Sequence, residues 1–306
     1  MHLRNVANAG DMTAAPFILR KARAFDRDLA QAIRRVATKA DEEALHDMRV
    51  AMRRLRTLLR LSRPLYGRFR TDTVRAAFSE VQSRTGELRD EEVLEETFDA
   101  LGVDDPVFVA WRARRRGREK RLRSTLIASL QKGDLARPRK LLSALLIFPL
   151  KPSRDKVLSR FARRAVTRAR KKVDALRDVP TSDVEQMHAL RILYKELRYG
   201  AEIFAEVLPI DLAALLVPAA KFQKRLGDIH DIDMALDAIA RARRLPSETR
   251  ARVAGALAEA RARRAKKYLD DMAPTPELAP TPRVEPPARL AILPIARVAS
   301  AERRAR

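Results

Sequence analysis

The chain contains an internal repeat with a period of about 142 residues, which is the offset between His46 and His188. Two blocks recur in the same order: residues 45–56 match residues 187–198, and residues 82–90 match residues 223–231. His46 and His188 coincide in the first block, and Gly86 and Gly227 coincide in the second. Two matched blocks in one order indicate that the chain folds as two similar halves.

The composition and the apolar spacing are typical of helices. Glycine occurs only 9 times in 306 residues, and apolar residues recur at intervals of three and four. These features predict an all-α fold of two four-helix bundles, related by a pseudo-two-fold axis through the internal repeat. The expected helices are residues 16–39, 41–65, 71–100, 105–131, 154–178, 182–207, 211–243 and 247–272.

The domain organisation follows from these helices and from the prolines. We expect an N-terminal arm (1–14), a first half (15–131), a connector (132–153), a second half (154–272) and a tail (273–306). The tail is rich in proline and ends in a basic segment, so we expect it to be disordered. Its charge is compatible with a solvated terminus or with an auxiliary anion-binding role.

The charge balance predicts an anionic partner. The chain has 64 Lys and Arg residues against 40 Asp and Glu residues, a formal net charge of +24, on a sequence that is 46% hydrophobic and therefore able to form a core. Cysteine is absent, which excludes disulfides, thiolate metal sites and a cysteine nucleophile. With neither a membrane-spanning apolar run nor a secretory signal in the sequence, we expect a cytoplasmic protein.

The first repeat block places a cationic stripe on one helix face. At 3.6 residues per turn, an arc of about 80° holds His46, Arg49, Arg53, Arg56 and Arg60. The adjoining arc is apolar and holds Met48, Met52, Leu55 and Leu59. The second repeat block has the same layout, with His188, Arg191, Lys195 and Arg198 beside Leu190, Tyr194 and Leu197. Glu202 takes the position that corresponds to Arg60.

Such a stripe does not stabilise a helix, because like charges on one face repel by a few tenths of a kcal/mol per pair. An extended ligand with regularly repeated charge would explain it, since guanidinium groups bind phosphate oxygens in a bidentate manner. The alternative is a solvated face whose arginines pair with carboxylates on neighbouring helices. The recurrence of the stripe with a histidine in register favours the ligand.

The two histidines of the stripes suit an anion site that responds to protons. Neighbouring arginines should hold each histidine neutral until an anion arrives, so that binding raises its affinity for a proton. A buried histidine with satisfied hydrogen bonds and a catalytic base are the alternatives. No serine or cysteine nucleophile stands at a repeated position beside them.

The second repeat block adds glycines, carboxylates and further cations. Gly86 and Gly227 lie inside helical stretches and predict a close helix crossing or a kink. Asp90 and Asp231 follow one turn later and are expected to pair with neighbouring cations rather than bind ligand or metal. The cations expected near the same cleft are Arg84, Lys221, Lys224 and Arg225. The basic runs 111–123 and 261–267, which include Arg114, Arg121, Arg264 and Lys267, fit either solvated faces or a shared anion surface.

These blocks resemble the CHAD family, an α-helical domain named for its histidines, over about residues 15–272. The resemblance rests on Leu45-His46-x-x-Arg49-Val50-x-x-Arg53-Arg54-Leu55-Arg56, on Met187-His188-x-Leu190-Arg191-Ile192-x-x-Lys195-x-Leu197-Arg198-Tyr199, and on Gly86-x-Leu88-Arg89-Asp90 with Leu226-Gly227-x-x-x-Asp231. It implies two four-helix bundles around a basic central groove or pore that binds inorganic polyphosphate, often at polyphosphate granules. Two departures are Thr85, where the family usually has Leu, and Glu202, which is expected to make the halves unequal in affinity.

The resemblance also bears on domain partners. Members of this family are frequently joined to a CYTH domain, whose β-barrel pattern and Glu-x-Glu-x-Lys signature are absent from this sequence. We therefore expect a standalone member.

The predicted function is non-catalytic binding of inorganic polyphosphate, with polyphosphate granule components or polyphosphate-metabolising enzymes as further expected partners. No cofactor, metal ion or membrane contact is expected. The residues expected to bind polyphosphate are His46, Arg49, Arg53, Arg54, Arg56, Arg60, Arg84, Arg114, Arg121, His188, Arg191, Lys195, Arg198, Lys221, Lys224, Arg225, Arg264 and Lys267.

Two other functions fit part of the sequence. Nucleic acid would suit the charge, but aromatic residues make up only 5% of the chain and no nucleic-acid-binding motif is present, so nucleic acid is expected only as a weaker competitor. An enzyme acting on polyphosphate or nucleoside triphosphates would need convergent carboxylates for metal ions. The sequence has no P-loop, and Asp90 and Glu92, like Asp231 and Asp233, point apart at two-residue spacing on a helix.

Overall fold

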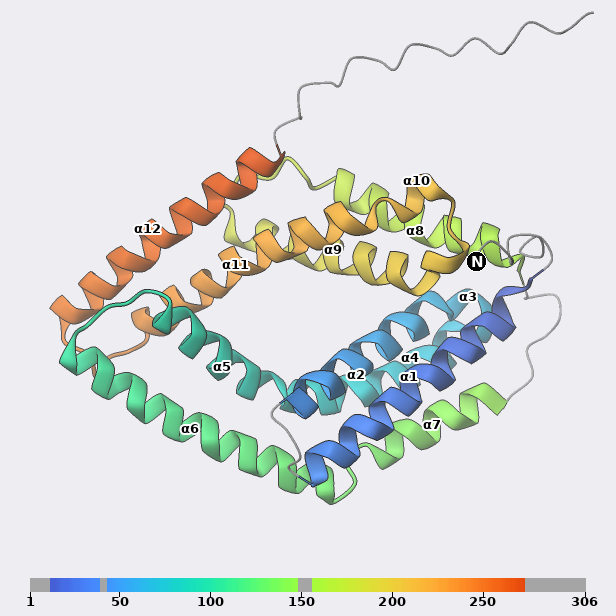
Figure 1. Cartoon of the computed structure of the whole chain (residues 1–306), viewed down its shortest axis with the longest axis horizontal. Coiled ribbons are helices and arrows are strands. Elements are labelled where there is room, and N and C mark those ends of the chain that lie inside the picture. The colour runs from blue at the N-terminus through green and yellow to red at the C-terminus, as the bar shows by residue number, and fades with distance from the viewer. Residues whose placement is uncertain (1–11, 39–42, 148–155, 273–306) are drawn as a thin grey trace, which may run out of the picture.

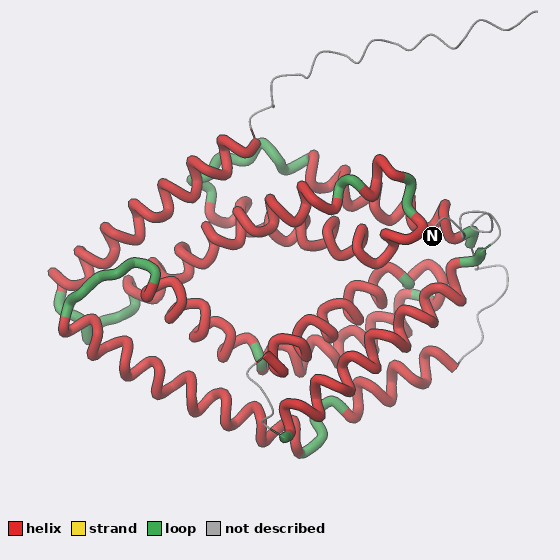
Figure 2. Tube along the Cα trace, in the orientation of Figure 1, coloured by secondary structure: helices red, strands yellow, loops and turns green. Residues whose placement is uncertain are grey.

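The computed structural model describes residues 12–38, 43–147 and 156–272, and these form helices joined by short loops (Figures 1 and 2). No strand occurs among them beyond one isolated antiparallel bridge between Thr13 and Val157. The all-α prediction is confirmed. The N-terminal arm up to residue 11 and the predicted disordered tail lie outside the described residues.

The described residues up to 131 form six helices in place of the four predicted. They are α1 (Ala14–Ala37), α2 (Glu43–Leu61), α3 (Arg63–Tyr66), α4 (Arg68–Arg84), α5 (Gly86–Asp99) and α6 (Pro106–Gln131). The predicted helix 71–100 is divided into α4 and α5 at Thr85, next to Gly86, where a close helix crossing or a kink is expected. Gly67 separates α3 from α4 with a φ of 87°, which a residue with a side chain rarely adopts.

The rest of the chain continues the helical pattern. It contains α7 (Ala136–Ile147), α8 (Leu158–Asp174), α9 (Val184–Phe204), a short 3₁₀ helix (Ala205–Val207), α10 (Ile210–Ala213), α11 (Leu216–Ala240) and α12 (Ser247–Met272). The predicted connector thus contains a helix, α7, which packs against α4 of the first half. At Gly227 α11 runs on without interruption.

Local sequence explains where several of these helices begin. Asp105 precedes α6, and its Oδ1 accepts hydrogen bonds from the backbone N–H groups of Val107 at 2.9 Å and Phe108 at 3.1 Å, while Pro106 occupies the first helical position. The Asp183 side chain accepts from the backbone N–H of Gln186 at 2.9 Å at the start of α9. These caps satisfy N–H groups that a helix leaves unpaired in its first turn.

Two hydrophobic cores join the halves. The first core lies mainly among α1, α2, α4, α7, α8 and α9 and extends to parts of α5, α6, α11 and α12; in it the rings of Phe17 in α1 and Phe204 in α9 stack at 5.6 Å. The second core joins the α5–α6 hairpin to the α11–α12 hairpin, and includes Phe98, Phe108 and Ile232. Because both cores contain residues from both repeats, the halves pack as one unit.

The helices form an elongated frame in Figures 1 and 2. Helices α1 to α4 and α7 lie on one side, α8 to α10 lie opposite, and the two hairpins meet at the far end. At the near end the backbone N–H of Ala14 donates to Lys156 O and that of Leu158 donates to Met12 O, both at 2.8 Å, so the start of α1 is tied to the start of α8. No helix within the described ranges is long and apolar enough to cross a membrane.

Candidate functional site

The apolar residues predicted beside the two cationic stripes are buried, and this orients the stripes. Met48, Met52 and Leu55 in α2 are fully buried, as is Leu190 in α9. The cationic side chains of α2 and α9 are therefore held along the boundary of the core. The two helices contact each other, so the stripes of the two halves lie close together.

Four cations converge where α2 meets α9, and we call them the central cluster: Arg49, Arg53, Arg191 and Lys195. Each is partly buried. Burial, together with the charges of Arg191, Arg53 and Arg49, lowers the pKa of Lys195 to about 8, although Asp231 opposes the shift. Two of these three arginines belong to the first half, so the cluster is shared between the halves.

The central cluster forms no ion pairs of its own. Within the described ranges no carboxylate lies within ion-pair distance of any of its four cations. The Nε atoms of Arg53 and Arg191 are buried and have no hydrogen-bond partner there either. Burial is also the largest influence that lowers the pKa of Arg191. Unpaired buried donors carry a free-energy cost that an anionic ligand would remove.

One hydrogen bond between a stripe and its neighbouring helix occurs in both repeats. Arg56 Nη1 donates to Gln82 Oε1 at 2.7 Å, and the matching Arg198 Nη1 donates to the matching Gln223 Oε1 at 3.3 Å. Arg49 donates to the backbone carbonyl of Thr85 and, at 3.1 Å, to its hydroxyl oxygen. The pseudo-two-fold relation itself stays a prediction, but the aligned arginines Arg56 and Arg198 make equivalent contacts with aligned glutamines.

Next to the central cluster lies a cavity of about 240 Å³ between α2, α4 and α9. It is lined by Arg53, Arg56, Thr57, Arg60, Arg75, Ile192, Lys195, Glu196 and Tyr199. The guanidinium groups of Arg53 and Arg198 lie 5.1 Å and 5.5 Å from the centre of the Tyr199 ring. These cation–π contacts hold two arginines of different halves beside one another.

The two predicted histidines differ in their surroundings. The His188 ring lies 4.7 Å from that of His230, between ring centres, whereas the exposed His46 has no ring partner in the part of the chain described. Burial and the charges of His230, Arg191 and Lys195 lower the pKa of His188, as the sequence predicts. His230, which the sequence did not single out, faces Asp231 with Nδ1 3.5 Å from Oδ1. The signal that could have identified it is its position in the second repeat block, where it aligns with Arg89.

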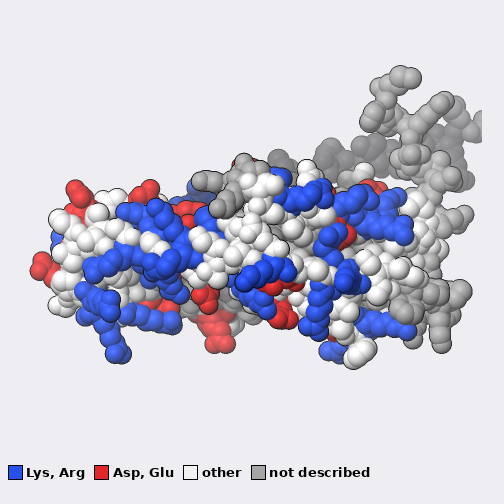
Figure 3. All heavy atoms as spheres, turned by 90° about the horizontal axis from the view of Figure 1, so that it is seen from below, with Lys and Arg blue, Asp and Glu red and all other residues white. Residues whose placement is uncertain are grey.

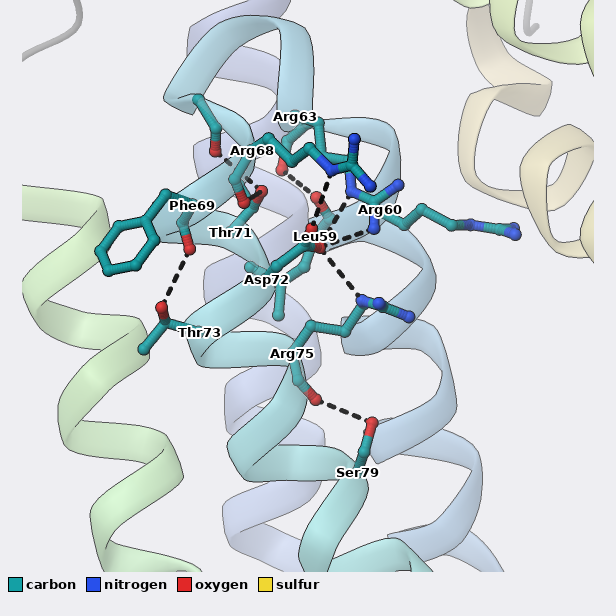
Figure 4. Close-up of polar contacts among 12 residues, drawn as sticks. Leu59, Arg60, Arg63, Arg68, Phe69, Thr71, Asp72, Thr73, Arg75 and Ser79 are labelled. Carbon is teal, nitrogen blue, oxygen red and sulfur yellow. Dashed lines mark hydrogen bonds and ion pairs between the residues drawn. The ribbon is translucent and has the colours of Figure 1, made fainter.

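Arg60 extends from the stripe of α2 toward α9, where it forms an ion pair with Glu196. Figure 4 shows that its side chain points away from Asp72, around which Arg63, Arg68 and Arg75 gather. Burial and the charges of Arg75, Arg63 and Arg56 lower the pKa of Arg60 to about 10, so it is charged at neutral pH. Glu196, one turn before Gly200, is thus the carboxylate that neutralises this end of the stripe.

Several predicted site residues lie away from the central cluster and have other partners. Arg54 faces α1, with its guanidinium 5.9 Å from the centre of the Phe25 ring. The others form ion pairs: Arg84 with Asp134 and Glu80, Lys221 and Arg225 with Asp271, and Lys224 and Arg264 with Asp228. The structure therefore does not bring these residues into the α2–α9 site, and all but Arg54 are held by carboxylates of the same or a neighbouring segment.

The basic run of α6 is largely a paired surface. Arg112, Arg115, Arg116, Arg118 and Arg123 form ion pairs with carboxylates of α5. The predicted Arg114 and Arg121 in α6 and Lys267 in α12 are exposed and stand apart from the cluster. On the face drawn in Figure 3, Lys and Arg side chains spread widely, with Asp and Glu among them. The alternative of solvated, carboxylate-paired faces therefore describes this run better than a shared anion surface.

The structure has a second basic surface, on α8, that the sequence did not lead us to predict. A cavity of about 640 Å³ lies between α2–α3 and α8–α9, and its basic lining includes Arg160, Arg164, Arg168 and Lys172 of α8. Their spacing of four residues was a visible signal, but α8 lies outside the repeated blocks. No group of three or more His, Cys, Asp or Glu side chains suited to a metal ion occurs in the described part of the chain.

Comparisons with known proteins agree with this architecture. The structure is similar to the crystal structure of the CHAD domain from the plant Ricinus communis, with a TM-score of 0.63 and 19% identity over 87% of this chain and 89% of that one. It is similar to PptA from Streptomyces chartreusis, with a TM-score of 0.63 and 17% identity over 85% of this chain and 97% of that one. A search of curated proteins finds no match. The model of the CHAD domain family matches residues 22–240, so the chain belongs to the CHAD domain family.

Proposed function

We propose that this chain binds inorganic polyphosphate, and that the central cluster is its main contact. The observation that carries the proposal is the convergence of four partly buried cations from two halves, none of which forms an ion pair with a carboxylate of the described residues. Like charges held together in this way repel each other, and a bound polyanion would turn that repulsion into attraction.

Phosphate suits these donors, and a linear polymer suits their arrangement. Guanidinium groups form bidentate hydrogen bonds with phosphate oxygens, while Lys195 acts as a point charge. The two cationic stripes extend beyond the central cluster along several turns of α2 and α9. A ligand with a charge on every unit can therefore contact their cations in succession. This is also the ligand that the resemblance to the CHAD family implies.

Nucleic acid is the main competing ligand, and the site suits it less well. Tyr199, the aromatic residue that lines the 240 Å³ cavity, has arginine guanidinium groups over its ring, so base stacking there would displace them. We expect long-chain polyphosphate to displace duplex DNA and RNA at equal phosphate concentration and moderate salt. Displacement in the opposite direction would refute the assignment.

Direct binding of labelled long-chain polyphosphate tests the site. The double variant Arg53→Gln/Arg191→Gln should bind at least tenfold more weakly, since hydrogen bonds to charged groups contribute roughly 1.5–3 kcal/mol each. Arg84→Gln/Lys221→Gln loses the same charge from exposed cations that already have carboxylate partners, and should differ little from the wild type. An equal loss of affinity in both double variants would show a general charge effect and no specific site.

We further propose that binding occurs without chemical conversion, in the cytoplasm and at polyphosphate granules. The absence of a P-loop from the sequence supports the first part, and the family resemblance supports the second. Incubation of the protein with polyphosphate and Mg²⁺ or Mn²⁺ should release no phosphate above the background. Release that depends on the metal and on the protein would make it an enzyme.

A further inference from the structure

Helix α8 carries a row of cations that the proposed site does not use. Arg160, Arg164, Arg168 and Lys172 are exposed and stand at intervals of four residues, over about 18 Å of helix. Adjacent like charges at this spacing weaken the helix. Arg160, Arg164 and Arg168 form no ion pair within the described ranges, whereas Arg170 on another face pairs with Asp174 at 3.5 Å.

The row borders a cavity large enough for a ligand. The 640 Å³ space between α2–α3 and α8–α9 has an apolar wall that includes Leu61, Phe161 and Ala165. Its volume falls in the range of about 300–1,000 Å³ that is usual for ligand sites. The cations of α8 line it from one side, and Arg60 and Arg63 line it from the other.

This cavity adjoins the 240 Å³ cavity beside the central cluster, because the two share lining residues. Arg60 and Glu196 line both cavities. At that junction Glu196 forms ion pairs with Arg60 of the first half and, at 3.5 Å, with Lys172 of α8. One carboxylate therefore partners two cations that would otherwise face an anion passing from one cavity to the other.

We propose that the cavity beside α8 is a second phosphate-binding subsite, in which a polyphosphate chain held at the central cluster continues, and that Glu196 competes with the ligand at the junction. This inference rests on the proposed function. A phosphate unit at the junction would take over the contacts of Arg60 and Lys172, and the Glu196 carboxylate would turn away from them. The continuity of the lining and the row of unpaired arginines favour a further stretch of the same polymer over a separate small ligand.

The dependence of affinity on chain length tests the second subsite. The triple variant Arg160→Gln/Arg164→Gln/Arg168→Gln should bind short polyphosphate like the wild type, and long polyphosphate about tenfold or more weakly. The slope of log affinity against log salt should fall by about two for long chains, because three phosphate contacts are lost. The control Arg163→Gln/Arg170→Gln/Lys171→Gln removes the same charge from exposed positions of α8 that do not line the cavity.

The outcomes separate this inference from the proposed function. If both triple variants lose the same affinity, or if the first loses none for long chains, the subsite is refuted while binding at the central cluster stands. If the wild type binds polyphosphate of no length, the proposed function itself fails. Loss of ATP binding in the first variant, with the length dependence of polyphosphate binding intact, would assign the cavity to another ligand and overturn the proposal.

The role of Glu196 has its own test. Glu196→Gln keeps the shape of the side chain and removes the competing charge, so long polyphosphate should bind several-fold more tightly. Glu206→Gln is the matched control, since Glu206 pairs with Arg20 and Lys21 at another place. Weaker binding by Glu196→Gln, or an equal gain in the control, would contradict competition at the junction.

Discussion

Lys195 is the residue of the central cluster that most strongly supports the proposed ligand site. Its ammonium group is partly buried among Arg49, Arg53 and Arg191, and burial and their charges lower its pKa to about 8. A lysine in this position is expensive for the folded protein, because both desolvation and repulsion oppose its charge. Function therefore explains the residue better than stability does.

The affinity for polyphosphate should depend on pH through Lys195. A bound polyanion favours the charged lysine and raises its pKa, so binding takes up a proton when the free lysine is neutral. The contribution of Lys195 to affinity should be level well below pH 8 and fall as the pH rises above it. Lys195→Arg should remove this fall, because arginine stays charged. An identical pH profile in the wild type and in this variant would contradict the shifted pKa.

Removing the same charge should stabilise the protein while weakening binding. Lys195→Met should raise the free energy of unfolding at pH 7 by about 3 kcal/mol, because a pKa lowered from 10.5 to about 8 corresponds to about 1.4 kcal/mol per pKa unit. The gain should be complete below pH 8 and vanish as the pH approaches the unfolded value of 10.5, since the folded wild type loses its buried charge over that interval. Denaturant titrations of both proteins at pH 7 and pH 10 measure it. A less stable variant at pH 7 would show that Lys195 supports the fold.

Among the helices, the sequence correctly predicted which faces of α2 and α9 are buried. It did not predict the ion-pair partners of the exposed face of α6. The apolar and cationic arcs of α2 and α9 follow from helical period alone, because burial of Met48 or Leu190 fixes where the neighbouring cations point. The basic run of α6 could not be assigned in this way. Whether Arg115 faces solvent, ligand or Glu91 depends on the placement of α5, which no local pattern encodes.

Gly227 lies in the middle of α11, where an alanine should fit. A Cβ at position 227 would lie 3.7 Å from Arg191 Nε, an ordinary van der Waals distance, and α11 is regular there. Gly227→Ala should therefore stabilise the protein by about 1 kcal/mol, since alanine is the better helix former. A loss of stability in thermal or denaturant unfolding would show that the close helix crossing expected from the sequence exists at this glycine.

Over the whole molecule, the two repeats pack as one unit, and we propose that they share one binding site. The halves share both hydrophobic cores, and α2 meets α9 so that Arg53 lies beside Tyr199 of the other half. The repeat in the sequence predicted two similar halves and two matched stripes. It could not predict α7 within the connector, or that the row on α8 lies beside Arg60, because both depend on how the halves pack.

We propose that cations of both halves act on one ligand. Calorimetric titration with a short polyphosphate of defined length tests it in the wild type and in the single variants Arg53→Gln, in α2, and Arg191→Gln, in α9. We predict one site per chain, with its affinity reduced about tenfold or more by either substitution. Two sites per chain, each lost in only one variant, would contradict a shared site, as would unchanged affinity in both.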